Sequence, residues 1–249
     1  MKKLLGIIVL GLLWCNVGVS KEIINIPVHV HILKVNEIGY KTMTTPGDIK
    51  KDFEEVNKIW SQANIFWEIK EIDEIEPNIK ALKKYLKWLE KNTLENKSLE
   101  EKQKIFDKTT VYLLKISKAR DYVLHTKRIN IYYVPSIYPF AKRTLSGLSI
   151  FPNHRYPNEI TWAFVGKIKN VGHSGVLFMS HKVEGSRGRV VAHELGHMLD
   201  LPHDGNPGEE LMSRLCVLKN YELVCGPNIS KAIANKARKY YYKYYQKLL

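Results

Sequence analysis

Alternation of apolar and polar residues predicts a β-strand soon after the first twenty residues. From Ile24 to Val35 the aliphatic side chains recur at every second position, as Ile24, Ile26, Val28, Val30 and Ile32. Because neighbouring side chains of a strand point to opposite faces, one face of a sheet is aliphatic here. The same alternation predicts a strand from Ile65 to Ile72. Shorter β-like runs are Val111–Ile116, Ile129–Val134, Gly147–Phe151, Ile160–Val165 and Val176–Ser180.

Helical spacing predicts helices between these strands. Thr45 has the character of an N-cap, and Pro46 suits the first helical position. Apolar side chains then repeat on one helix face, as Ile49, Phe53, Val56, Trp60 and Ala63. The stretch from Glu74 to Lys108 is rich in lysine and glutamate and predicts one or two surface helices inserted between core strands. A further helix is expected from Ser186 to Leu199.

The last helix begins near Ile229 and is capped by Asn228 or Ser230. One stripe of it is apolar and aromatic, formed by Ile229, Ile233, Ala237, Tyr240, Tyr241, Tyr244 and Leu248. Such a stripe is typical of a face that docks on the core of a domain. A basic, tyrosine-rich helix that lies on a membrane or a nucleic acid is the alternative.

Residues 1–20 have the layout of a secretory signal peptide. Two lysines precede eleven apolar residues from Leu4 to Trp14, and the small residues Gly18 and Ser20 follow. A membrane-spanning helix needs about 20 apolar residues, so a signal cleaved near Ser20 is expected instead. Lipidation at Cys15 is a weaker alternative because of the bulky Trp14 before it. The remaining chain, 21–249, is expected to be secreted or periplasmic and to form one domain.

The composition is that of a globular protein of 249 residues, with 45% hydrophobic residues and a formal charge of +14. This excludes a wholly disordered chain, and the positive charge favours contact with anionic surfaces or simply solubility. Cys216 and Cys225 remain once the signal peptide is removed. In an oxidising compartment they are expected to form a disulfide that closes a small loop, with two free thiols as the alternative.

A candidate metal-binding site begins at His193. His193 and His197 are four residues apart, so on a helix both imidazoles lie on one face and can share a metal ion. Glu194 flanks the same site. Pro202 cannot continue the helix, and a turn at Asp200 would bring His203 back as a third ligand. Three imidazoles leave one coordination position open, which is the stoichiometry of a catalytic zinc ion.

This stretch resembles the metzincin signature H-E-x-x-H-x-x-G-x-x-H of zinc endopeptidases. The resemblance implies that His193, His197 and His203 bind zinc and that Glu194 is the general base for attack of a zinc-bound water on a peptide bond. It also implies that Met212, nine residues after His203, lies in a Met-turn beneath the metal. The family's glycine is Asp200 here. Asp tolerates the left-handed conformation at a cost of about 1 kcal/mol, so we expect the turn to be kept, with an oxygen ligand from Asp200 as the alternative.

The family's fold implies an α+β zincin domain: a mixed, mostly parallel twisted sheet with an active-site helix and a C-terminal helix. By analogy, Gly147, Leu148 and Ser149 belong to the edge strand that pairs with substrate. His29 and His31 share one strand face and could bind a second metal, although core or surface histidines are the more common explanation.

The predicted function is therefore that of a secreted, monomeric zinc endopeptidase whose partners are protein or peptide substrates, without specific nucleic-acid binding. The alternative is a basic surface-binding module for anionic polymers or membranes whose zinc is structural or weakly active. A third possibility keeps the zinc chemistry but directs it at bacterial or peptidoglycan peptides.

Overall fold

A computed structural model describes residues 22–37, 40–92, 97–118, 128–135, 147–150, 176–180, 186–203, 210–213, 217–219, 222–224 and 226–246. The predicted signal peptide, the strand expected at Ile160–Val165 and both Cys216 and Cys225 lie outside these residues. None of the helices in the described part of the chain combines the length and the apolar character that a membrane crossing requires.

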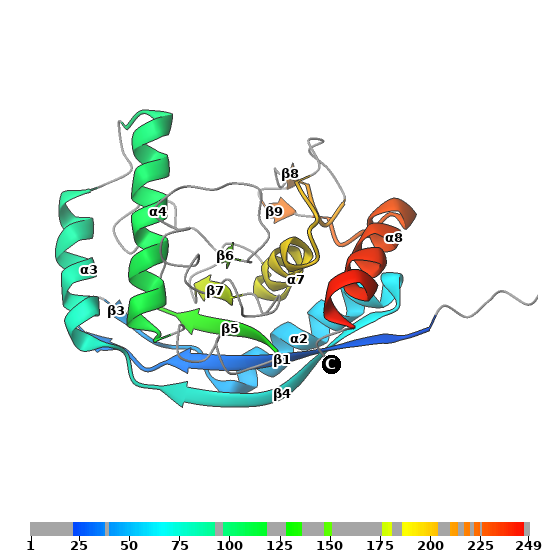
Figure 1. Ribbon diagram of the computed structural model, residues 1–249, viewed down its shortest axis with the longest axis horizontal. Coiled ribbons are helices and arrows are strands. Elements are labelled where there is room, and N and C mark those ends of the chain that lie inside the picture. The colour runs from blue at the N-terminus through cyan, green and yellow to red at the C-terminus, as the bar shows by residue number, and fades with distance from the viewer. Residues whose placement is uncertain are drawn as a thin grey trace, which may run out of the picture.

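A five-stranded sheet forms the centre of the molecule (Figure 1). Its strands lie in the order β4 (Ile65–Ile75), β1 (Ile24–Leu33), β5 (Ile129–Val134), β7 (Val176–Ser180) and β6 (Gly147–Ile150). β6 pairs antiparallel with β7, whereas the other neighbours are parallel. The sheet is thus mostly parallel with an antiparallel edge strand. Two short hairpins, β2 (Asn36–Glu37) with β3 (Tyr40–Lys41) and β8 (Val217–Lys219) with β9 (Glu222–Val224), lie apart from it.

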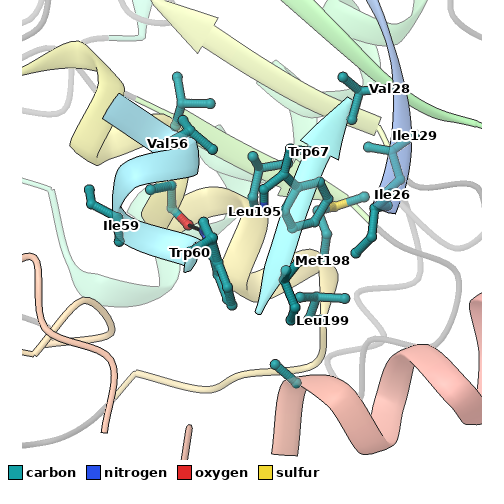
Figure 2. Packing of buried hydrophobic residues seen from close by; sticks show 14 of the residues in the cluster. Ile26, Val28, Val56, Ile59, Trp60, Trp67, Ile129, Leu195, Met198 and Leu199 are labelled. Atoms are coloured by element: carbon teal, nitrogen blue, oxygen red, sulfur yellow. Dashed lines mark hydrogen bonds between the residues drawn. The ribbon is translucent and has the colours of Figure 1, made fainter. Parts of the chain in front are cut away.

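One face of the sheet is covered by α2 (Pro46–Trp60), α7 (Arg187–Met198) and α8 (Lys231–Tyr240). The aliphatic stripe predicted for β1 packs on this face, and Figure 2 shows Trp60 of α2, Leu195 of α7 and Trp67 of β4 meeting in the same core. Ser61–Ala63 forms a single 3-10 turn between α2 and β4. The indole Nε1 of Trp60 donates a hydrogen bond to the carbonyl of Ala192 at 3.1 Å, so α2 and α7 are fixed to each other.

The opposite face of the sheet is covered by α3 (Ile79–Lys91) and α4 (Leu99–Ile116). Leu82 and Tyr85 of α3 are fully buried against this second core. The two helices expected in the 74–108 stretch are thus present between the core strands β4 and β5. Their apolar faces fill a second core, and α4 continues to Ile116, beyond the predicted end.

The β-like run at Val111–Ile116 is wrong as a strand, because it is the last turn and a half of α4. A capping box of Ser98 and Glu101 stabilises the N-terminus of this helix. Leu113, Leu114 and Ile116 are buried there. Tertiary packing of a helix that is already nucleated overrides the local β-preference of this segment.

The predicted start of α2 is confirmed. Thr45 is the N-cap, its side chain accepts a hydrogen bond from the backbone of Asp48, and the Asp48 side chain accepts from the backbone of Thr45. The docking stripe of the C-terminal helix is confirmed where it is described. Ser230 is the cap of α8, and Ala237, Tyr240 and Tyr241 are buried in the core. Beyond α8 the chain continues as a π-helical turn, Tyr241–Tyr245.

Candidate metal centre

The helix α7 is anchored to the fold at its N-terminus. Ser186 caps it and contacts the carboxylate of Glu55, while Nε of Arg187 donates to Oδ2 of Asp52 at 2.7 Å. Gly188 is required here, because a Cβ at this position would lie 2.9 Å from the backbone oxygen of Asp52. The first turn of α7 therefore lies directly on two carboxylates of α2.

Asp52 is the centre of this anchor and is only 7% exposed. The hydroxyl of Tyr133 on β5 donates to the same Asp52 oxygen at 3.0 Å. Burial raises the pKa of Asp52 above its usual value, although the hydrogen bonds from Arg187 and Tyr133 oppose that rise. Asp52 was not among the residues predicted from the sequence. Its spacing could have indicated that it is buried, since Asp52 lies three residues after Ile49 and four before Val56, on the apolar face of α2.

Each of the two histidines of α7 is oriented by a backbone carbonyl. Nδ1 of His193 lies 2.6 Å from the carbonyl oxygen of Leu211, and Nδ1 of His197 lies 2.7 Å from that of Leu201. A carbonyl only accepts, so both Nδ1 atoms carry the proton. The lone pair of each neutral ring is then on Nε2, the atom that faces the candidate site.

The turn after α7 has the predicted left-handed residue. Asp200 has a φ of 59°, its N–H donates to the carbonyl of His197 at 3.0 Å, and the N–H of Leu201 donates to that of Gly196 at 3.1 Å. These two bonds define a Schellman motif, the usual end of a helix at a left-handed residue. Asp200 is exposed and is not in the group of ligand atoms. The expectation that the turn is kept is confirmed.

The turn brings His203 back to the two helical histidines. Its Nε2 lies 3.2 Å from Nε2 of His193 and 3.2 Å from Nε2 of His197. Two nitrogens bound to one tetrahedral zinc ion at 2.0–2.1 Å are separated by about 3.3 Å. The Nε2 atoms of His193 and His197 thus lie at the distance from Nε2 of His203 that a shared zinc ion requires. This set of three imidazole nitrogens fits zinc.

Exposure of the three rings leaves the site accessible. His193 and His197 are partly buried, and His203 is exposed. Glu194, on the same helix, is also partly buried. A metal bound by the three imidazoles would keep one side toward solvent, as a site that must admit a substrate requires.

A tight turn that contains Met212 lies beneath the histidines. The N–H of Ser213 donates to the carbonyl of Glu210 at 3.1 Å, and the N–H of Leu211 is bound by the carbonyl of Asn228. Met212 is buried, and its sulfur lies where a side chain on Gly196 would extend. The turn therefore packs against the helix between the two histidines and also supplies the Leu211 carbonyl that orients His193.

The remaining predicted residues are placed as follows. Gly147, Leu148 and Ser149 lie in β6, at the edge of the sheet, and β6 contacts α7. His29 and His31 form, with Asp73, a second group of possible ligands on other elements. The sequence had indicated the two histidines but not Asp73.

Comparisons with known proteins add little to this geometry. No protein-family model matches the chain, and no curated protein matches it. Among solved structures, one described as "Structure of a chaperone-substrate complex" aligns with 12% identity and a TM-score of 0.39. The alignment covers 89% of this chain and 35% of the other, so the chain spans about a third of the length of that match.

Proposed function

We propose that this chain is a zinc-dependent endopeptidase of the metzincin type, with His193, His197 and His203 as zinc ligands and Glu194 as the general base. The observation that supports it most directly is the convergence of three imidazole Nε2 atoms, two of them 3.2 Å from the third. Three histidines that served only the packing of the core would not need backbone carbonyls to orient the rings of His193 and His197. They would also not leave the ring of His203 exposed.

When bound, zinc would supply a Lewis acid that polarises the scissile carbonyl and lowers the pKa of a water molecule toward 7. The protein's own residues do the rest. Glu194 accepts the proton of the attacking water and returns it to the leaving amine, so no serine or cysteine nucleophile is needed. The carbonyls of Leu211 and Leu201 keep the imidazoles in the tautomer that binds metal and hold the ring planes still.

The substrate chain is proposed to bind along β6. Among the described strands β6 pairs with β7 alone, and its other edge is proposed to offer backbone groups to an extended peptide. Because β6 contacts α7, such a peptide would run beside the three histidines. Recognition through the backbone favours cleavage within a chain rather than at its ends.

The rival surface-binding function depends on a helix that is largely committed to the core. Arg238 of α8 is 8% exposed, and its guanidinium binds the carbonyls of Ala63 and Glu22. Tyr240 and Tyr241 are likewise buried. The tyrosine stripe thus stabilises the fold, which leaves the lysines as the groups available to an anionic surface.

The test is cleavage of a fluorogenic peptide library by purified protein with zinc, compared with Glu194→Gln. We expect kcat to fall about 100- to 10,000-fold in this variant while the zinc content stays the same. Glu54→Gln is the matched control, since Glu54 is exposed on α2 and makes the same change of charge. Full activity in Glu194→Gln, or no cleavage by the zinc-loaded wild type, would overturn the proposal.

A further inference from the structure

A second group of possible metal ligands lies on the face of the sheet away from α7. Alternate residues of β1 pack in the core beneath α2, α7 and α8, so His29 and His31 project to the other face. One ligand atom of His29, one of His31 and one of Asp73 on β4 all lie within 4.8 Å of one another. These three residues are called the strand cluster below.

A β-bulge produces this cluster. Val28 pairs with Ile69, but the next residue, His29, pairs with Glu71, so Lys70 is the extra residue on β4. Beyond the bulge His31 pairs with Asp73. Without the extra residue, His31 would face Ile72 instead. The bulge thus turns two carboxylates to the face that carries the two histidines.

His29 is buried without a hydrogen bond on either ring nitrogen. It is only 7% exposed. Nε2 lies 3.4 Å from Oε2 of Glu71 and 3.5 Å from Oδ2 of Asp73, distances typical of two ligands on one ion rather than of a hydrogen bond.

The tautomer of His31 is set by Asn130 of β5. The Asn130 amide nitrogen donates to the carbonyl of Arg128 at 3.2 Å, which leaves its Oδ1 as an acceptor 3.0 Å from Nε2 of His31. Nε2 therefore carries a proton. Nδ1 faces Oδ1 of Asp73 at 2.6 Å, the distance of a charge-assisted hydrogen bond, so a proton lies between these two atoms. A metal ion bound here would replace that proton and separate the two atoms to about 3.3 Å.

That proton satisfies His31 and Asp73, but it leaves His29 without a hydrogen bond in the core. A cation bound by one nitrogen of each ring and by the carboxylate would give His29 a partner as well. We propose that the strand cluster binds a second divalent transition-metal ion, zinc above all, with His29, His31 and Asp73 as ligands and Glu71 at the rim. Imidazole and carboxylate together suit such ions.

The ion can reach this site from the edge of the sheet. β4 is the outermost of the described strands on this side of the sheet. The side chains of Asp73 and Glu71 are 30% and 56% exposed, whereas that of His29 is 8% exposed. Bound metal would therefore tie the edge strand to the central strand β1 through side chains, in addition to the ladder of backbone hydrogen bonds. Its role would be to stabilise the fold.

The experiment counts zinc ions per chain by mass spectrometry after saturation and desalting. The wild type is expected to hold two ions and Asp73→Asn one. Glu74→Gln is the matched control and should hold two, since Glu74 is the next residue of the same strand and pairs at the surface with Lys34. The double variant His193→Ala, His197→Ala should keep the ion of the strand cluster.

Asp73→Asn is preferred to a change of His29 because it is isosteric and lies on an edge strand, and circular dichroism will verify that it folds. Zinc should raise the Tm of the double variant by about 5 °C, a gain that adding Asp73→Asn removes. The proposal is overturned if the double variant binds no zinc or if Asp73→Asn still holds as many ions as the wild type. A lack of peptide cleavage would count against the proposed function and leave these ratios unchanged.

Discussion

The two histidine clusters of this protein are built in opposite ways. His193 and His197 lie on one helix, and His203 follows His197 by six positions and returns to them through the turn that ends the helix. The geometry of this cluster is therefore encoded within a short stretch of sequence. His29 and His31 meet a carboxylate that is 42 residues away from His31 and belongs to another strand. The first cluster is partly exposed, whereas the histidines of the second are buried. Accessibility suits catalysis, and burial between strands suits stabilisation.

The largest expected effect separates the clusters by activity. His197→Ala removes a ligand of the exposed cluster, and we expect kcat/KM for peptide cleavage to fall about 1,000-fold or more. Asp73→Asn should leave kcat/KM within about twofold, although each variant loses one zinc ion. Parallel kinetics and metal analysis of the two proteins provide the measurement. Equal losses of activity would show that the clusters are not independent.

The anchor of α7 should matter next. Asp52→Ala leaves Arg187 and Tyr133 without their shared partner, and breaking a buried pair of this kind costs about 3 kcal/mol. Urea unfolding measures the loss, with Glu54→Ala on the exposed face of α2 as the control at under about 0.5 kcal/mol. The strand cluster should keep its ion, because the hydrogen-bond partners of Asp52 lie on α7 and β5 and not on the strands β1 and β4 that carry the cluster. A loss below about 1 kcal/mol would contradict the role given to this carboxylate.

The turn that returns His203 provides a smaller effect. Asp200→Ala puts a residue that disfavours a φ of 59° into the Schellman motif, and we expect a loss of about 1 kcal/mol relative to Asp200→Gly. Both variants should still bind zinc at the exposed cluster, since Asp200 is outside its ligand set. Thermal unfolding and metal titration measure the two quantities. If Asp200→Gly bound zinc much more weakly, Asp200 would have to be a ligand after all.

The smallest effect depends on pH and concerns the cap of α2. Hydrogen bonds from the hydroxyl and then the backbone N–H of Thr45 lower the pKa of Asp48. Because the folded-state pKa lies below the unfolded one, the stabilisation by Asp48 is present above the ordinary pKa of about 4 and disappears as the pH falls through the lowered value. Asp48→Asn should therefore cost about 0.3 kcal/mol at pH 7, because water screens this exposed carboxylate, and progressively less in acid. A constant difference from pH 7 to pH 2 would disagree with this.

The predictions from the sequence succeeded where geometry is local. The spacing of His193 and His197, the Thr45 cap and the left-handed Asp200 each involve residues within one or two helical turns, where dihedral preferences decide the outcome. The strand cluster was only half visible. The pairing of β4 with β1 sets which side chain faces His31, and the bulge at Lys70 shifts that pairing by one residue. No local pattern in β4 indicates such a shift.

In the 74–108 region the helices were predicted, but their part in the core was not, for a related reason. Lysine and glutamate dominate its composition, which suggested a solvated insert. The apolar minority, Leu82, Tyr85 and Leu89, nevertheless lies on one side of α3 and fills the second core. Whether an amphipathic helix covers a sheet depends on whether that face of the sheet is otherwise bare, and this is a property of the whole fold.

The hydrogen bond between Trp60 and Ala192 joins residues 132 positions apart in the chain. A contact of that span forms only after a large loop has closed, and a ribosome releases α7 long after the first two strands and α2. The histidines of the exposed cluster therefore acquire their scaffold late in synthesis. A nascent or truncated chain lacking this segment carries the first strands and helices but none of the three histidines of the exposed cluster.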